Sequence, residues 1–117
     1  MYEYVILAAD SIKDKVIKYR RDFHKYPESA WTEFRTASLI ARKLIDLGFE
    51  VKLGRDVIKE SSRMDIPSYN VLEDNYIRAV NQGADKELLP FFRGGFTGVV
   101  GIIKNGEGPT TALRFDI

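Results

Sequence analysis

The side chains that could carry chemistry are few, because the 117-residue chain contains one His and no Cys. Arg114 and Asp116 alternate with apolar residues at its C-terminal end, so they share one face of a predicted strand. Ligands of open α/β sheets bind outside the carboxyl ends of strands, which makes this pair the first candidate site. The competing interpretation is a structural salt bridge, since burial of an acid and a base favours their pairing.

A second polar group lies in a stretch where two arginines are mixed with acids and hydroxyls. Its members are Arg55, Asp56, Glu60, Ser61, Ser62 and Arg63. The guanidinium groups of Arg55 and Arg63 match the geometry of a carboxylate, so these two residues are candidates for binding an acidic substrate. A solvated loop held by local ion pairs is the alternative interpretation.

The other residues of chemical interest favour structural roles. His24 comes near the end of a predicted helix, where an imidazole more often complements the helix dipole than acts as a base. Gly94, Gly95, Gly98 and Gly101 precede or lie in a predicted strand and lack the Gly-Lys-Ser/Thr sequence of a phosphate loop, so turns and close packing explain them. With a single His and no Cys, the chain alone is not expected to hold a transition-metal centre.

Composition narrows the expected partners and location. The 18 Lys and Arg residues balance 17 Asp and Glu residues for a net charge of +1, which argues against nucleic acid and anionic membranes as partners. No apolar run is long enough to span a bilayer, and the start of the chain lacks the basic region of a signal peptide. We therefore expect a cytoplasmic protein with no membrane partner, folded as one globular unit over residues 1–117.

Hydrophobic periodicity predicts two helices followed by a strand. The first helix ends before Pro27, and the second spans about residues 32–47 and stops at Gly48. Residues 49–53 alternate apolar and charged side chains, which is typical of a strand. The first helix carries an apolar stripe that is expected to face inward and comprises Val5, Ala9, Ile12, Val16, Tyr19 and Phe23.

The rest of the chain is predicted to form a largely helical excursion followed by strands. The excursion covers about residues 54–92, with one helix ended by Gly83 and a last helical turn before Pro90. Residues 96–104 and 110–117 are predicted to pair as a hairpin. The expected fold class is α/β, with α+β as an alternative, in which two N-terminal helices pack on a partial sheet that ends in this hairpin.

Several segments resemble the N-terminal opening of the metal-dependent amidohydrolases related to aminoacylase and glutamate carboxypeptidase. They are residues 20–28, 33–37, 47–51, 96–101 and 108–116. The excursion is similar to one branch of that family, the branch that uses aminobenzoyl-glutamate. The segments that carry this narrower resemblance are residues 53–57, 60–64, 67, 82–84 and 94–98.

The resemblance implies the incomplete catalytic domain of a dimetal, peptidase-like fold. In the family, two zinc or manganese ions activate a water molecule that attacks an amide, and a glutamate acts as the general base. The matched segment ends before the family's metal ligands, so the resemblance implies no metal-binding residue and no bound cofactor in these 117 residues. Asp116 matches an aspartate that lies beside the metal site without binding the metal, and Arg114 occupies a position where other branches carry a ligand histidine.

The leading interpretation is the N-terminal portion of an amidohydrolase that cleaves p-aminobenzoyl-glutamate to p-aminobenzoate and glutamate. The fragment alone is expected to be inactive, while the full-length protein would have a small-molecule substrate and would pair with a B subunit. The alternatives are a related hydrolase of other N-acyl amino acids or dipeptides, and a complete, non-catalytic binding or assembly module. Because the apolar run 110–117 lacks a turn or cap, we also expect the fragment to self-associate through an unpaired strand edge.

Overall fold

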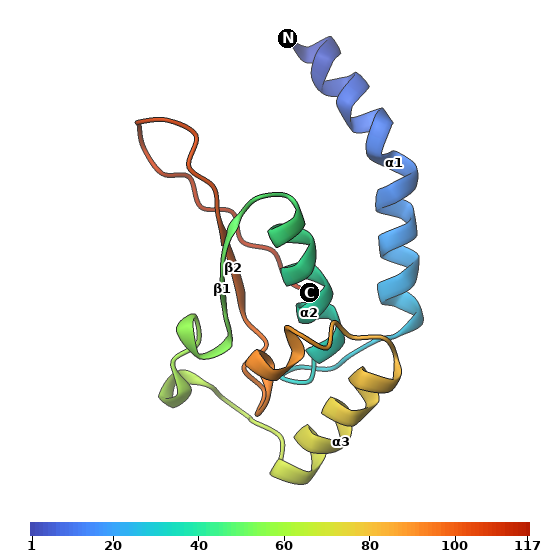
Figure 1. Ribbon diagram of the computed structural model, residues 1–117, viewed down its shortest axis with the longest axis vertical. Helices are drawn as coiled ribbons and strands as arrows, with labels where there is room; N and C mark the ends of the chain where they lie inside the picture. Colours follow the sequence, from blue (N-terminus) through green and yellow to red (C-terminus); the bar gives the residue numbers. More distant parts are fainter.

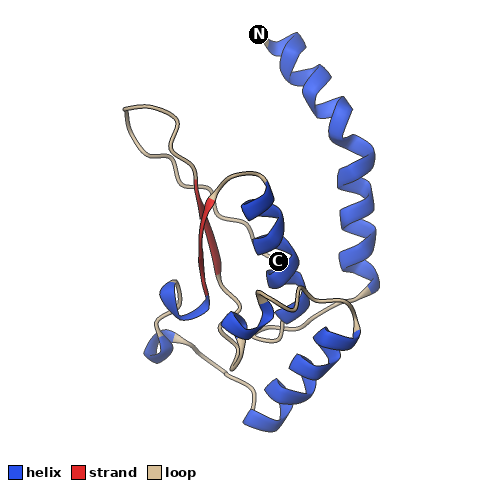
Figure 2. Ribbon diagram, in the orientation of Figure 1, coloured by secondary structure: helices blue, strands red, loops and turns tan.

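Three α-helices and a small sheet, joined by short 3-10 helices, make up the computed structural model, which describes residues 1–117. The coarse α/β prediction is confirmed. In chain order the elements are α1 (Tyr2–Lys25), α2 (Phe34–Asp46), β1 (Glu50–Leu53), η1 (Gly54–Asp56), η2 (Glu60–Ser62), α3 (Tyr69–Asn81), η3 (Leu89–Phe92) and β2 (Val99–Ile102). Figure 2 shows how much of the chain is helical and how short the two strands are. None of the helices combines the length and the apolar character that a membrane span requires.

The sheet pairs two strands that are far apart in the sequence. β1 and β2 run antiparallel, with Glu50 opposite Ile102 and Leu53 opposite Val99. Residues 54–98, which contain the predicted excursion, therefore connect two neighbouring strands, as Figure 1 shows.

The predicted C-terminal hairpin is wrong. The strand within residues 96–104 is present as β2, but its partner is β1, and residues 110–117 form no strand. The physical reason is that α2 covers the β1–β2 pair: a side chain at Gly101 would meet Leu44 and Phe49 at about 3.1 Å. No second layer covers residues 110–117, which are all exposed, and pairing without a covered apolar face adds little stability.

Helix α1 has the predicted extent but not the predicted environment. It ends at Lys25, with Tyr26 as its C-cap just before Pro27. None of its residues is buried, and Val5, Ile12 and Val16 in the apolar stripe are each more than half exposed. In Figure 1 the first half of α1 extends away from the other elements, and its last turns approach α2. The expected packing of this helix was therefore predicted wrongly for residues 5–16 of the stripe, because no other element covers them, whereas Tyr19 and Phe23 face α2 across a cavity.

This bare helix leads to a prediction about hydrogen exchange. An isolated helix is marginally stable in water, because its hydrogen bonds are not supported by packing. We expect amides of residues 6–14 to exchange at least about a hundredfold faster than amides of the buried face of α2, in keeping with local opening. Exchange followed by NMR would check this, and equal protection of the two helices would contradict it.

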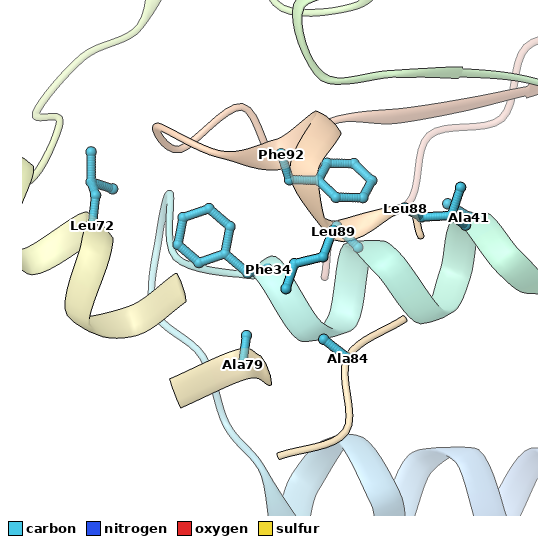
Figure 3. Packing of buried hydrophobic residues seen from close by; sticks show 9 residues of the cluster. Phe34, Ala41, Leu72, Ala79, Ala84, Leu88, Leu89 and Phe92 are labelled. Atoms are coloured by element: carbon cyan, nitrogen blue, oxygen red, sulfur yellow. The ribbon is translucent and has the colours of Figure 1, made fainter. Parts of the chain in front are cut away.

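Helix α2 supplies the centre of the core. Phe34, Ala37 and Ala41 recur at helical spacing and are buried, and the helix ends before Gly48, whose φ of +86° only glycine adopts without strain. The ring of Phe34 meets Tyr76 of α3 edge to face, with centroids 5.5 Å apart. Figure 3 shows the side chains that surround Phe34, which come from α3, η3 and the segment between them. The core cluster is Phe34, Ala37, Ala41, Leu72, Ala79, Ala84, Leu88, Leu89 and Phe92.

The excursion therefore contributes core residues rather than only a surface loop. Helix α3 begins after Ser68, whose hydroxyl accepts the Val71 N–H at 3.4 Å, and it ends before Gly83 as predicted. The last predicted turn lies further along the chain: η3 runs through Pro90, which at an early helix position needs no N–H donor.

Candidate functional site

The structure brings two of the three predicted site residues together and separates the third. Arg55, at η1, and Arg63, just after η2, both lie against the ring of Phe96, with each guanidinium carbon 3.8 Å from the ring centroid. Asp116 belongs to the exposed C-terminal run and lines a different cavity. The predicted sites are therefore one arginine pair and one separate carboxylate.

The arginine pair is held by a buried ring and a shared carboxylate. Phe96 is 1% exposed, so the ring gives both planar cations a fixed, dehydrated surface. Glu60 accepts a hydrogen bond from Nη1 of Arg55 at 3.1 Å and lies 3.6 Å from Nη2 of Arg63. Nη1 of Arg63 also donates to the carbonyl oxygen of Gly94 at 2.7 Å.

The two arginines differ in what they can still bind. The Arg63 side chain is 8% exposed, and it ties η2 to the loop that precedes β2. Arg55 is 64% exposed, so its guanidinium can reach a carboxylate in solution. Of the two predicted substrate-binding residues, Arg55 is accessible to a ligand, whereas Arg63 is buried and supports the local structure.

Asp116 lines a cavity of about 330 Å³ close to the start of α2. Glu28 and Glu33 line the same cavity, so three carboxyl-bearing residues share it. Each has a partner: Asp116 pairs with Arg114 at 2.9 Å, and Glu33 accepts a hydrogen bond from Thr97 at 2.9 Å. Arg114 and Asp116 thus form the ion pair of the salt-bridge alternative, although the pair is exposed rather than buried.

The residues present do not fit a divalent metal ion. No group of three or more His, Cys, Asp or Glu side chains is arranged to hold one. The carboxylate of Glu28, the most buried of those in the cavity, is already committed to three donors. A metal centre built on this fold would need ligands from outside these residues.

Sequence reasoning missed Glu28, a buried carboxylate that accepts three hydrogen bonds. Its side chain is 1% exposed and accepts the backbone N–H groups of Arg35 and Thr36, at 3.0 and 2.7 Å, at the start of α2. It also accepts from Arg78 of α3 at 2.8 Å, so one carboxylate joins the two helices. An acid a few residues before a helix start was the available signal, because helix N-termini attract negative charge.

A cavity of about 570 Å³ lies between α1 and α2. Apolar side chains from both helices line it, including Phe23 and Ile40, together with charged groups such as Lys18 and Arg42. It reflects the loose attachment of α1, whose polar link to α2 is the Asp22–Arg35 pair at 2.9 Å.

Two ion pairs outside these sites each contain a carboxyl group whose pKa is lowered. The Arg42 guanidinium, 2.6 Å from Asp85, holds the pKa of that carboxyl below its usual value, and the backbone N–H groups of Leu88 and Glu87 act in the same direction. Arg93 likewise lowers the pKa of Glu73, at 2.6 Å. These pairs fasten α2 to the segment before η3, and α3 to the segment after it.

A pH dependence of stability follows from these directions. A carboxyl with a lowered folded pKa stabilises the fold above its unfolded pKa of about 4, and this contribution is lost as the pH falls through the folded value. We expect the free energy of unfolding to decrease as the pH is lowered below about 5, and Asp85→Asn to flatten that dependence. Urea titrations at stepped pH values would measure it. Asp74→Asn is the matched control, since this exposed acid on α3 makes no ion pair; a flattening as large as that of Asp85→Asn would contradict the assignment.

Comparisons with known proteins found relatives of this chain. No family model matches the sequence. The chain is 46% identical over 109 residues to the A subunit of p-aminobenzoyl-glutamate hydrolase from Escherichia coli (strain K12), a match that covers 92% of this chain and 25% of that protein. It is 45% identical over 104 residues to indole-3-acetyl-aspartic acid hydrolase of Enterobacter agglomerans, covering 88% of this chain and 24% of that protein.

A solved structure supports the same relationship. The crystal structure of aminobenzoyl-glutamate utilization protein from Klebsiella pneumoniae superposes with a TM-score of 0.79 at 46% identity, covering 80% of this chain and 24% of that one. The chain therefore spans about a quarter of the length of the relatives that it matches.

Proposed function

We infer from its similarity to known proteins that the chain belongs to the family of the p-aminobenzoyl-glutamate hydrolase A subunit, as its sequence motifs predicted. We propose that it forms the N-terminal part of an amidohydrolase catalytic domain. The reaction would be hydrolysis of p-aminobenzoyl-glutamate to p-aminobenzoate and glutamate. The observation that supports this proposal is the similarity over most of the chain, at 46% identity and a TM-score of 0.79. A cytoplasmic location is part of the same proposal.

The relatives widen the proposed substrate class slightly. The protein named as a hydrolase of indole-3-acetyl-aspartic acid is 45% identical to this chain, close to the 46% of the p-aminobenzoyl-glutamate hydrolase chain. Both named compounds are amides that join an aromatic acyl group to a dicarboxylic amino acid. A related N-acyl-amino-acid hydrolase is therefore the second candidate, and the shared feature is an acidic product.

Within the chain, we propose that Arg55 binds the carboxylate of such a substrate. Its guanidinium is exposed and oriented by the Phe96 ring and Glu60. Arg63 would act indirectly, because it holds the same ring from the buried side. Asp116 would lie near the reacting centre without binding metal.

The metal chemistry of the proposed enzyme would depend on ligands beyond these residues. Manganese or zinc is the proposed ion for the full-length enzyme, and the 117 residues alone are expected to be inactive because they hold no ligand set. A B subunit is a proposed partner, since the relative is named as the A chain of its enzyme. The remaining alternative is a complete, non-catalytic binding or assembly module, which would have no hydrolase activity.

Kinetic measurement on a longer gene product tests these proposals. With manganese or zinc present, it should hydrolyse p-aminobenzoyl-glutamate and indole-3-acetyl-aspartate with higher kcat/KM than neutral dipeptides, whereas the 117-residue chain should give no turnover. Arg55→Gln should raise KM about tenfold with kcat little changed, because a binding interaction shared by ground and transition states affects KM. Arg93→Gln, which removes an exposed arginine paired elsewhere, is the control. Turnover by the 117-residue chain alone would refute the assignment.

A further inference from the structure

The buried ring of Phe96 lies between two arginine side chains. The guanidinium carbons of Arg55 and Arg63 are both 3.8 Å from the centroid of the ring. Two planar groups cannot occupy the same face at that distance, so each cation covers one face. Arg55 is on the exposed side of the ring and Arg63 is on the buried side. The ring therefore holds an accessible cation and a buried cation in fixed planes.

One carboxylate is shared by both cations, and it is closer to the exposed one. Glu60 accepts a hydrogen bond from Nη1 of Arg55 at 3.1 Å. Its other oxygen is 3.6 Å from Nη2 of Arg63, which is too long for a good hydrogen bond. Nε of Arg63 is buried and has no hydrogen-bond partner. The buried arginine, for which a close counter-ion matters more, thus has the weaker contact.

A ligand carboxylate at Arg55 would change this balance. Two anions on one guanidinium repel each other at short range, and Arg63 offers Glu60 a second cation close by. The Glu60 side chain is exposed, so it can turn toward Arg63 by rotation about its own bonds. The Phe96 ring continues to hold the plane of the Arg55 guanidinium when Glu60 moves away.

We propose that Glu60 is an internal competitor for the ligand carboxylate: it pairs with Arg55 in the free protein and moves to Arg63 when an acidic ligand binds. This inference rests on the proposed carboxylate-binding role of Arg55. Glu60 then sets the affinity for acidic ligands without contacting them, and Arg63 receives the displaced carboxylate. The four residues that carry the inference contact one another directly within residues 55–96.

Titration of the 117-residue chain with p-aminobenzoyl-glutamate, followed by NMR, tests this exchange without turnover. Binding should shift the Nε–H resonances of both Arg55 and Arg63, although the ligand contacts Arg55 alone. Glu60→Gln should lower the dissociation constant by about threefold, the scale of an exposed ion pair. It should also remove the ligand-dependent shift of Arg63, because no carboxylate then moves toward that arginine.

Two variants and one ligand serve as controls. Glu73→Gln removes the carboxylate from another exposed arginine, Arg93, which lies over the ring of Tyr76, and it should bind the ligand like the wild type. p-Aminobenzamide, which carries no carboxylate, should shift neither Arg55 nor Arg63. In an Arg55→Gln background, Glu60→Gln should have no further effect on binding, because the cation for which the two carboxylates compete is absent.

Each departure from these results has a definite meaning. Unchanged binding by Glu60→Gln would make the Glu60 contact an ordinary surface ion pair, and weaker binding would make Glu60 a group that orients Arg55; both overturn the proposal. An Arg63 resonance that does not respond to the ligand, or a wild-type chain that does not bind it, would overturn it as well. If Arg55→Gln binds as tightly as the wild type, the carboxylate-binding role of Arg55 also fails. Hydrolysis by the longer gene product is measured separately, so failure of this inference can be distinguished from failure of the proposed function.

Discussion

Glu28→Gln is expected to lower the free energy of unfolding by about 3 kcal/mol, the scale for breaking a buried charge network. The carboxylate accepts two backbone N–H groups at the start of α2 and one guanidinium N–H from α3. An amide of the same shape has one acceptor oxygen, and its NH₂ group faces donors instead of acceptors. Arg78 then keeps its charge at the α2–α3 boundary without the carboxylate that balances it.

Urea unfolding followed by circular dichroism measures this effect. Glu60→Gln is the matched control: its carboxylate also contacts two arginines, but it is 66% exposed, so a change within about 0.5 kcal/mol is expected. If the two substitutions cost the same, Glu28 does not join α2 to α3 in the way described.

Gly54→Ala is the second substitution with a large expected effect. Gly54 has a φ of +56°, and a Cβ there would stand 2.1 Å from the carbonyl oxygen of Phe91. The backbone must move apart, which separates η1 from η3, and the left-handed conformation adds its own cost. We expect a loss of about 3 to 5 kcal/mol, combining steric overlap with conformational strain.

Gly48→Ala separates the two contributions. Gly48 also has a positive φ, at +86°, but nothing lies within 4 Å of the position that a Cβ would take there. It should cost about 1 to 2 kcal/mol, the conformational part alone. Equal losses at both glycines would mean that the close approach of Phe91 to Gly54 does not hold in solution. If Gly54→Ala does not fold in buffer, urea unfolding of both variants in a stabilising osmolyte would report the same ranking.

Local patterns predicted the elements well, and long-range pairing poorly. The ends of α1 and α2, the strand β1 and the break at Gly48 follow from Pro27, helical spacing and strand alternation, all of which act within a few residues. The partner of β2 could not be found this way. Residues 110–117 are near in sequence and strand-like, but α2 covers β1 and β2 together, and that tertiary contact decides the pairing.

The burial and the contacts of the candidate residues could not be predicted from local sequence patterns either. The stripe of α1 has correct spacing, but periodicity cannot show whether a partner surface is present. Arg55 and Arg63 could be grouped by their types, whereas their meeting on Phe96, and the burial of Arg63, depend on a residue more than thirty positions away. Glu28 was visible as an acid before a helix, but its third partner, Arg78, comes from α3.

The central proposal is that this chain supplies part of an amidohydrolase related to p-aminobenzoyl-glutamate hydrolase. The most direct test replaces the matching quarter of the Escherichia coli A chain with this chain and measures p-aminobenzoate release in the presence of the proposed metal ions, manganese or zinc, and the proposed B subunit. The account predicts a chimera whose kcat/KM lies within about tenfold of the parent enzyme, a difference of about 1.4 kcal/mol in barrier height. A chimera that folds and assembles like the parent but does not hydrolyse p-aminobenzoyl-glutamate would contradict it.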